Sequence, residues 1–232
     1  MTSIESLVDR QIRRGQLAER AAQQHKGIGQ GSPPFLRVIT ISRQTGAGGR
    51  RLAARIAAQL NFELIDRQVL ELLVENSGAR ERLIHSLDKD VISGIDMWVA
   101  GILAGRYIDR SEYAQLLVCV VTALAEHGES VIVGRAANVI LGQRGGLHLR
   151  LVAPADARVR NLMDWQGLSE KDACVKVARV DEERRRFYRN YFDADADDPE
   201  GYHLIINTAR VPESLADEMV LSAWHHLQAG ER

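Results

Sequence analysis

The sequence predicts one α/β domain whose sheet is mostly parallel and covered by helices on both faces. Three observations favour this fold. Five short hydrophobic runs have the composition of strands, the segments between them have helical spacing, and a glycine-rich turn follows the first run. With 232 residues, 26% charged and 45% hydrophobic, the chain suits one such domain, with or without a helical extension.

The predicted elements follow one another along the chain. The five strands are expected at 35–41, 62–65, 130–134, 147–152 and 202–206. The helices between them are expected at 50–60, 67–76 and 135–141, from a capping box at 169–172 to about 192, and from Pro212 onward. About fifty mostly helical residues precede His127. This insertion includes Met97, Trp98, Ile102 and Leu103, which we interpret as core or subunit contacts.

The first 34 residues are predicted to be an extension of the domain at 35–232. Apolar residues recur at helical spacing over 4–24, and a Gly/Pro-rich linker follows at 27–34. The apolar stripe needs a partner. We predict that this helix helps to form a homodimer, together with the insertion around 97–103, and docking within the same chain is the alternative.

Composition limits the partners and the compartment. The net charge of −1 excludes a globally basic nucleic-acid binder. The longest uncharged stretch, 113–125, is far shorter than the roughly 20 residues of a membrane span. Cys119 and Cys174 have neither disulfide-framework nor zinc spacing. We therefore expect a cytoplasmic protein with no nucleic-acid or membrane partner and no metal-binding cluster. The acidic run at 193–200 is interpreted as a mobile hinge.

The turn after the first strand is the strongest functional signal. Gly46, Gly48 and Gly49 lie between a strand and a helix N-terminus, an arrangement that directs backbone N–H groups at phosphate. Aligned with the phosphate-binding pattern G-x-x-x-x-G-K-[ST], Arg43 takes the first glycine position and Gly49 the lysine position. Arg50 takes the position of the hydroxyl that holds magnesium. The missing lysine charge needs a replacement, and Arg50 and Arg51 are the local candidates.

Four segments of the chain resemble the cytidylate kinase-like family, a divergent branch of the P-loop nucleoside monophosphate kinases. They are 39–50, 65–67, 131–138 and 202–208, and the resemblance runs from about 36 to 225. It implies a five-stranded P-loop sheet, an arginine-rich lid, and transfer of a phosphoryl group from ATP, with Mg²⁺, to CMP or dCMP. In this branch the loop without lysine is the usual pattern. The chain departs from true cytidylate kinases at 133–136, where Arg135 is kept but two carboxylates are lost.

These features assign roles to particular residues. ATP phosphates are expected on Arg43, Gln44, Thr45, Gly46, Ala47, Gly48, Gly49, Arg50 and Arg51. The acceptor is expected on Asp66, Arg67 and Arg135. For Asp66 a helix-capping role is an equal alternative, and for Arg135 the alternative is an ion pair with an acidic neighbour.

The arginine-rich helix before residue 192 supplies the expected lid. Arg179, Arg186 and Arg189 share one stripe, which Arg184 and Arg185 do not. We assign catalytic roles to Arg179 and Arg186 from this helix, and to Arg50 from the loop. On this basis Arg50→Ala should lower turnover by about 10²- to 10³-fold.

Three functions remain open at this point. The first is a nucleoside monophosphate kinase. The second is a nucleotide-binding regulatory protein that transfers nothing, which the missing lysine, hydroxyl and carboxylates favour. The third is a kinase of another small metabolite.

Overall fold

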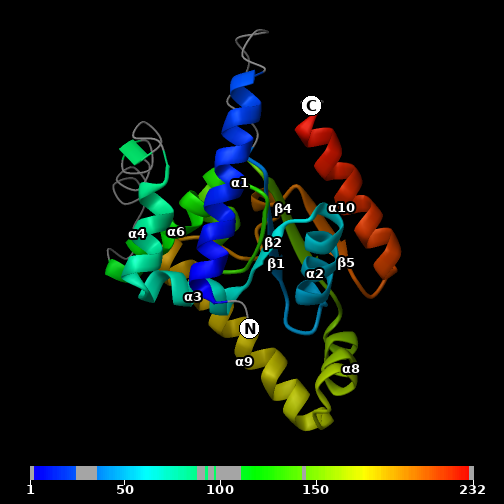
Figure 1. Ribbon diagram of the computed structural model, residues 1–232. Helices are drawn as coiled ribbons and strands as arrows, with labels where there is room; N and C mark the ends of the chain where they lie inside the picture. The colour runs from blue at the N-terminus through cyan, green and yellow to red at the C-terminus, as the bar shows by residue number, and fades with distance from the viewer. Residues whose placement is uncertain are drawn as a thin grey trace.

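A computed structural model describes residues 3–24, 36–87, 92–93, 97, 111–142 and 145–229. Its centre is a sheet of five strands in the order β2-β3-β1-β4-β5, and every neighbouring pair is parallel (Figure 1). The strands are β1 (Val38–Arg43), β2 (Glu63–Ile65), β3 (Ser130–Val133), β4 (Leu147–Val152) and β5 (Leu204–Asn207). The predicted five-stranded α/β fold of the P-loop type is confirmed.

Strand β1 lies in the middle of the sheet. It pairs with β3 through Val38–Ser130 and with β4 through Ile39–Leu147, and its first five residues are buried. A run of β-branched residues fits a strand that is covered on both faces. Since all five strands are parallel, their carboxyl ends meet at one edge of the sheet, where open α/β sheets bind ligands.

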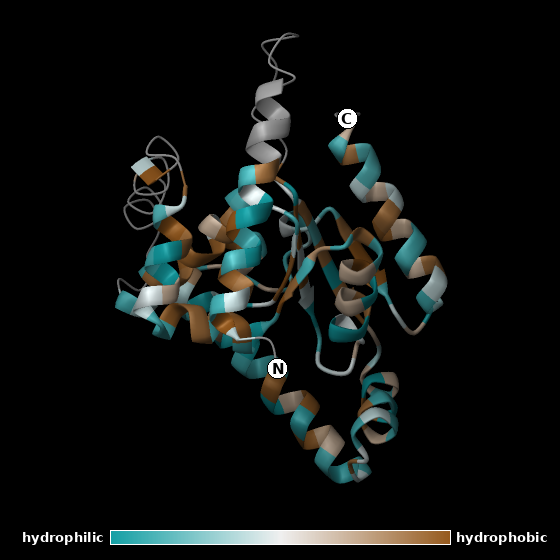
Figure 2. Ribbon diagram, viewed as in Figure 1, coloured by the Kyte–Doolittle hydropathy of each residue, from teal (hydrophilic) through white to brown (hydrophobic). Residues whose placement is uncertain are grey.

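Helices cover both faces of the sheet. The helices α2 (Gly49–Leu60) and α10 (Glu213–Gln228) pack on one face, around a core that includes Ile41, Ile56 and Trp224. On the other face, α3 (Arg67–Glu75), α4 (Ser77–His85), α6 (Glu112–His127) and α7 (Ala137–Leu141) share a second core with β3. Most hydrophobic residues of the strands and of α6 are therefore buried. Figure 2 shows hydrophobic residues along the central strands.

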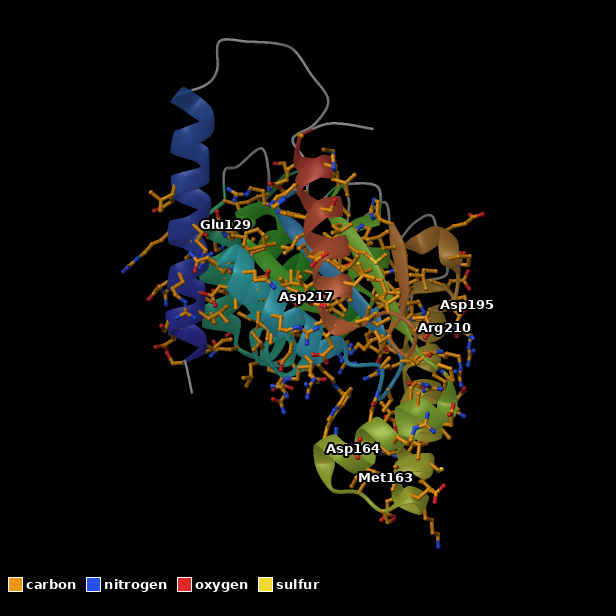
Figure 3. All side chains as sticks on the ribbon, turned by 90° about the vertical axis from the view of Figure 1, so that its right-hand side faces the viewer. Glu129, Met163, Asp164, Asp195, Arg210 and Asp217 are labelled. Atoms are coloured by element: carbon orange, nitrogen blue, oxygen red, sulfur yellow. The ribbon has the colours of Figure 1, made fainter. Side chains whose placement is uncertain are left out.

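A helical hairpin projects beyond the carboxyl edge of the sheet (Figure 1). It consists of α8 (Ala155–Gln166), which carries Met163 and Asp164 (Figure 3), and of α9 (Glu170–Phe192). The capping box is confirmed, since Ser169 Oγ accepts a hydrogen bond from Asp172 N. The sequence analysis did not predict α8. After α9 the chain reaches β5 through a short 3₁₀ helix at Pro199–Gly201.

The N-terminal helix, α1 (Ile4–Gln24), docks on its own chain. Leu7 and Val8 are buried in the core shared with α4 and α6. Arg10 pairs with Glu63 at 2.5 Å, and Arg14 pairs with Glu129 at 3.0 Å (Figure 3). Docking within the same chain, the alternative that the sequence left open, is thus present. A role of α1 in a homodimer stays a prediction.

Several element boundaries differ from those predicted. The first strand begins at Val38 and continues through Ser42 and Arg43. Helix α3 ends at Glu75, within one residue of the predicted end at 76, and a second helix, α4, begins directly at Ser77, where Asn76 caps it by accepting from Ala79 N. Arg135 and Ala136 have φ of 53°, so α7 begins only at Ala137.

Other expectations fall partly or wholly outside the described residues. The linker at 27–34 is among these, so the predicted boundary at residue 34 stays a prediction. Within the insertion, Trp98, Ile102 and Leu103 also lie outside the described residues, and the side chain of Met97 is exposed. No helix in the described ranges is long and apolar enough to cross a membrane.

Candidate active site

The loop between β1 and α2 has the backbone of an anion-binding turn. Gly46 and Gly48 adopt φ of 82° and 78°, which other residues rarely adopt, and Gly48 is the N-cap of α2. Four backbone N–H groups here have no acceptor among the described residues; they belong to Gly46, Gly48, Gly49 and Arg50. Free N–H groups at a helix N-terminus favour a phosphate.

The outer side of this loop is fastened to the α8–α9 hairpin. Thr45 N donates to Asp181 Oδ1 at 2.7 Å, and Arg158 donates to the other oxygen of the same carboxylate and to Thr45 O. Asp181 and Arg158 are both buried. Asn161 Nδ2 adds a bond to Gly46 O at 2.8 Å. The hairpin therefore holds the loop in one conformation, and Thr45 N is not available to a ligand.

Two cavities open beside the loop. The loop cavity, of about 390 Å³, lies against α2 and the hairpin. Its lining comprises residues 43–46 and 48–51 together with Leu162, Trp165, Gln166, Lys176, Val180 and Arg184. All of the predicted ATP-phosphate residues except the buried Ala47 line this cavity.

The second cavity, of about 300 Å³, also has Arg43 in its lining, and we call it the acceptor cavity because the sequence predicts the acceptor on its residues Arg67 and Arg135. Five arginines besides Arg43 line it, from four different elements or turns: Arg67, Arg135, Arg150, Arg184 and Arg185. Asp181, Glu183 and Asp197 are its acidic residues. The excess of guanidinium groups suits an anionic ligand such as a phosphate monoester.

Arg43 and Arg184 line both cavities and mark the place where the two meet. Arg184 Nη1 donates to Arg43 O at 3.0 Å and to Thr45 Oγ1 at 2.9 Å, and it lies 3.5 Å from Asp181. Burial, and then the nearby charge of Arg184, lower the pKa of Arg43 to about 9. Burial also lowers the pKa of Arg184. A half-buried pair of like charges is stabilised by an anion between them.

Asp66 and Arg67 begin α3 at the end of β2. Asp66 Oδ1 caps this helix by accepting from Gln68 N and Val69 N, so the capping role is present. Its other oxygen lies 3.0 Å from Arg50 Nη2. Arg67 lines the acceptor cavity and pairs with Glu71 at 2.9 Å.

Arg135 follows β3, and the ion pair that the sequence offered as its alternative role is present. It forms an ion pair with Glu71, and its guanidinium lies 4.7 Å from the centre of the Phe187 ring. It also lines the acceptor cavity. Burial, and then the neighbouring charge of Arg67, lower its pKa to about 10. Phosphate binding by Arg135 stays a prediction.

The predicted stripe of lid arginines lies on the outer face of α9. Arg179 pairs with Glu183 at 2.6 Å, and Arg186 and Arg189 pair with Glu182 at 2.9 Å and 3.2 Å. These three side chains are exposed and line neither cavity. The catalytic role of Arg179 and Arg186 stays a prediction, but Arg184 is the arginine of this helix that faces the loop.

Sequence reasoning missed two further residues of the acceptor cavity. Arg150 is buried in β4, where it donates to Ser42 Oγ at 2.8 Å and pairs with Asp197 of the acidic run. Tyr188 donates to Asn138 Oδ1 at 2.8 Å, and burial raises the pKa of its hydroxyl. A charged residue inside the apolar run of β4 was a usable signal for Arg150. Nothing in the sequence marks Tyr188.

A parallel sheet with an anion-binding turn after its central strand, and with two arginine-lined cavities that meet beside the turn, defines a P-loop kinase. Residues 38–210 match the cytidylate kinase-like family, and the chain belongs to this family.

Proteins of known name and known structure resemble it. A cytidylate kinase of Pyrococcus horikoshii is 31% identical over 190 residues, which cover 82% of this chain and 89% of that protein. A cytidylate kinase of Thermococcus kodakarensis is 27% identical over 198 residues, with the same two coverages. The crystal structure of an uncharacterized protein from Eubacterium ventriosum has the same fold, with a TM-score of 0.65 at 22% identity, and covers 82% of this chain and 98% of that one.

Proposed function

We propose that this protein transfers the γ-phosphoryl group of ATP to a nucleoside monophosphate, with CMP or dCMP as the acceptor. One observation carries the proposal: the loop cavity and the acceptor cavity share Arg43 and Arg184. A donor phosphate on the free N–H groups of the loop and an acceptor phosphate among Arg67, Arg135 and Arg150 would then meet at these two guanidinium groups. The family and the named relatives support CMP as the acceptor.

In this mechanism the chain contributes positioning and electrostatic stabilisation, with no covalent intermediate. The loop N–H groups would bind the donor phosphates, and Arg135 would orient the acceptor phosphate. Arg184 and Arg43 would stabilise the negative charge that spreads over the transferring group. Helices α8 and α9, held to Thr45 through Asp181, would keep water from the junction of the cavities.

Magnesium fits this site as a companion of ATP. The described residues contain no group of three or more histidines, cysteines or carboxylates that could hold a metal ion. Arg50 stands where the pattern has a hydroxyl ligand, and it pairs with Asp66. Mg²⁺ would therefore be held mainly by the triphosphate and would neutralise part of its negative charge.

A nucleotide-binding regulatory protein without transfer activity is the second candidate. Two observations favour it. Glycine, at Gly49, stands at the position of the loop lysine, and the N–H group of Thr45 already donates to Asp181. A kinase of another small metabolite is the third, because Val133 and Ala136 stand at the two positions where the resemblance led us to look for carboxylates.

An ADP-release assay with ATP, Mg²⁺ and a panel of nucleoside monophosphates separates these functions. We expect turnover with CMP or dCMP, and Arg135→Ala should raise the KM for that acceptor by about 10- to 100-fold, in the range of one lost charged contact. The KM for ATP should stay within about twofold of wild type. ATP binding without turnover on any acceptor would instead support the regulatory protein.

A further inference from the structure

The glycine and the cation at two positions of the phosphate-loop pattern are interchanged in this chain, at Arg43 and Gly49. In G-x-x-x-x-G-K-[ST] the first position is glycine and the seventh is lysine. In this chain the first position is Arg43 and the seventh is Gly49. A cation is therefore present in the loop, six residues before its usual place.

The side chain of Arg43 occupies the space that a lysine at position 49 would need. A Cβ atom added to Gly49 would lie 2.8 Å from Arg43 Cβ, 2.7 Å from Arg43 Cγ and 3.2 Å from Arg43 Cδ. Real Cβ atoms essentially never approach carbon atoms below 3.0 Å. The aliphatic part of Arg43 thus passes directly over Gly49, and the two positions cannot both carry a long side chain in this geometry.

A second glycine makes room for the charged end of Arg43. A Cβ atom at Gly134, after β3, would overlap with Arg43 Nη1. Gly134 also has φ of 86°, a conformation that other residues rarely adopt. Between Gly49 and Gly134 the Arg43 side chain reaches the junction of the two cavities, which both include it in their lining.

The guanidinium group of Arg43 has no internal partner in the described part of the chain. Among the residues that the structure describes, it donates to none, and none of their carboxylates lies within 4.0 Å of it. The two arginines that the sequence favoured are engaged elsewhere. Arg50 pairs with Asp66 at 3.0 Å, and Arg51 pairs with Glu213 at 3.4 Å and lies 4.9 Å from the Trp165 ring centre.

The charges around Arg43 are mainly positive. Arg184 and Arg135 both lower its pKa, next to the larger effect of burial. Asp66 and Tyr188 act in the opposite direction but weakly enough that the pKa falls to about 9. A partly desolvated cation beside like charges is unfavourable unless an anion joins it. The environment is therefore arranged for a ligand, not for a structural ion pair.

We propose that Arg43 takes the place of the loop lysine as the cation that binds the ATP phosphates, and that Gly49 is glycine because the Arg43 side chain lies over it. This inference rests on the proposed use of ATP. Arg50 and Arg51 then have supporting roles at the start of α2.

Calorimetric binding of ATP, and separately of tripolyphosphate, tests the exchange without any acceptor. Arg43→Gln keeps the aliphatic cover of Gly49 and removes the charge, and we expect it to weaken both affinities by about 100-fold. Gly49→Lys should weaken them similarly, because lysine and Arg43 compete for one space. The double variant Arg43→Ala/Gly49→Lys restores the usual order and should bind ATP at least tenfold better than Arg43→Ala alone. Arg160→Ala, which removes an exposed cation that pairs only with Asp156, is the matched control and should bind as wild type.

Thermal unfolding distinguishes loss of binding from loss of fold. Without ligand, Arg43→Gln should melt no lower than wild type, because it removes one of three neighbouring cations. Affinities for ATP and tripolyphosphate within twofold of wild type in Arg43→Gln would overturn the proposal, whatever the double variant does. Wild-type binding without turnover on any acceptor would overturn the proposed function and leave the role of Arg43 standing. A wild type that binds neither ligand would overturn both.

Discussion

The arginines on the two faces of α9 contact different groups. On the outer face, Arg179 and Arg186 pair with Glu183 and Glu182, carboxylates of the same helix. On the inner face, Arg184 lies 3.5 Å from Asp181, donates to oxygens of the phosphate loop and lies beside Arg43, which has no carboxylate partner among the described residues. The outer arginines are exposed to solvent, whereas Arg184 lines both cavities, where we propose that the phosphates bind. What each arginine of a helix contacts therefore says more about function than the number of arginines on the helix.

The first test of this difference removes one arginine from each face. Arg184→Ala should lower kcat/KM by about 10²- to 10³-fold, the usual cost of losing one transition-state donor. Arg186→Ala should leave kcat/KM within about twofold, because an exposed ion pair contributes about 0–1 kcal/mol. Steady-state kinetics of both variants with ATP and the best acceptor measures the contrast. Equal effects of the two substitutions would remove the distinction between the faces.

The second test compares two neighbouring acidic residues. Asp181 is buried with Arg158, so Asp181→Asn leaves a buried cation and should lower the free energy of unfolding by about 3–5 kcal/mol. Glu182 is exposed and pairs with Arg185, Arg186 and Arg189, and Glu182→Gln should leave the free energy of unfolding close to that of wild type. Urea denaturation of both variants gives the two values. A loss below 1 kcal/mol in Asp181→Asn would show that the hairpin is not held to the loop in this way.

The third test measures how the buried histidine His148, which is uncharged in the folded protein at neutral pH, makes stability depend on pH. His148 accepts from Thr40 Oγ1 at Nδ1 and donates from Nε2 to Gly142 O, and burial lowers its pKa from 6.5 to about 4. The unfolded chain therefore binds the extra proton first as pH falls. The free energy of unfolding is therefore unaffected by His148 above pH 6.5 and decreases as the pH falls from 6.5 toward 4. The decrease is at most about 3 kcal/mol, at 1.36 kcal/mol per pKa unit.

Unfolding free energies measured from pH 7 to pH 4 check this expectation. His148→Gln should flatten the decline, and the exposed His225→Gln should not. A residual slope is expected from His127 and His203, since burial lowers both of their pKa values as well. An unchanged slope in His148→Gln would contradict a neutral His148.

The smallest expected effect concerns Arg50. From the sequence alone we expected a loss of about 10²- to 10³-fold for Arg50→Ala. In the structure its side chain is 73% exposed and paired with Asp66, so we now expect a decrease in kcat/KM of about twofold to fivefold, equivalent to about 1 kcal/mol or less. A loss above 100-fold, measured beside Arg43→Gln, would return the lysine role to Arg50.

Local sequence patterns sufficed to predict the sheet and the loop. The strands are short segments rich in apolar residues, and Gly46 and Gly48 mark a turn that needs positive φ, so both could be found without tertiary information. The position of α8 could not be found in this way. Its residues are largely exposed, with only Arg158 and Leu162 buried, and they give no clear apolar stripe.

The site was harder to predict because its members depend on contacts across the chain. Arg43 was expected to bind phosphate, but its path over Gly49 exists only once β1 and α2 are in place. Helical spacing grouped Arg179 with Arg186 correctly as one stripe, yet it could not say which stripe faces the loop. That choice is made by Asp181, which binds Thr45 from 136 residues away in the sequence.

The central claim is that the two cavities form one continuous site with Arg43 and Arg184 at their junction. A bisubstrate compound in which adenosine and cytidine are joined by five phosphates tests it directly, by calorimetry. The account predicts that this compound binds at least about 100-fold more tightly than ATP, as expected when one linker holds two ligands in adjoining sites, and that both ATP and CMP compete with it. An affinity no better than that of ATP, with no competition by CMP, would contradict it.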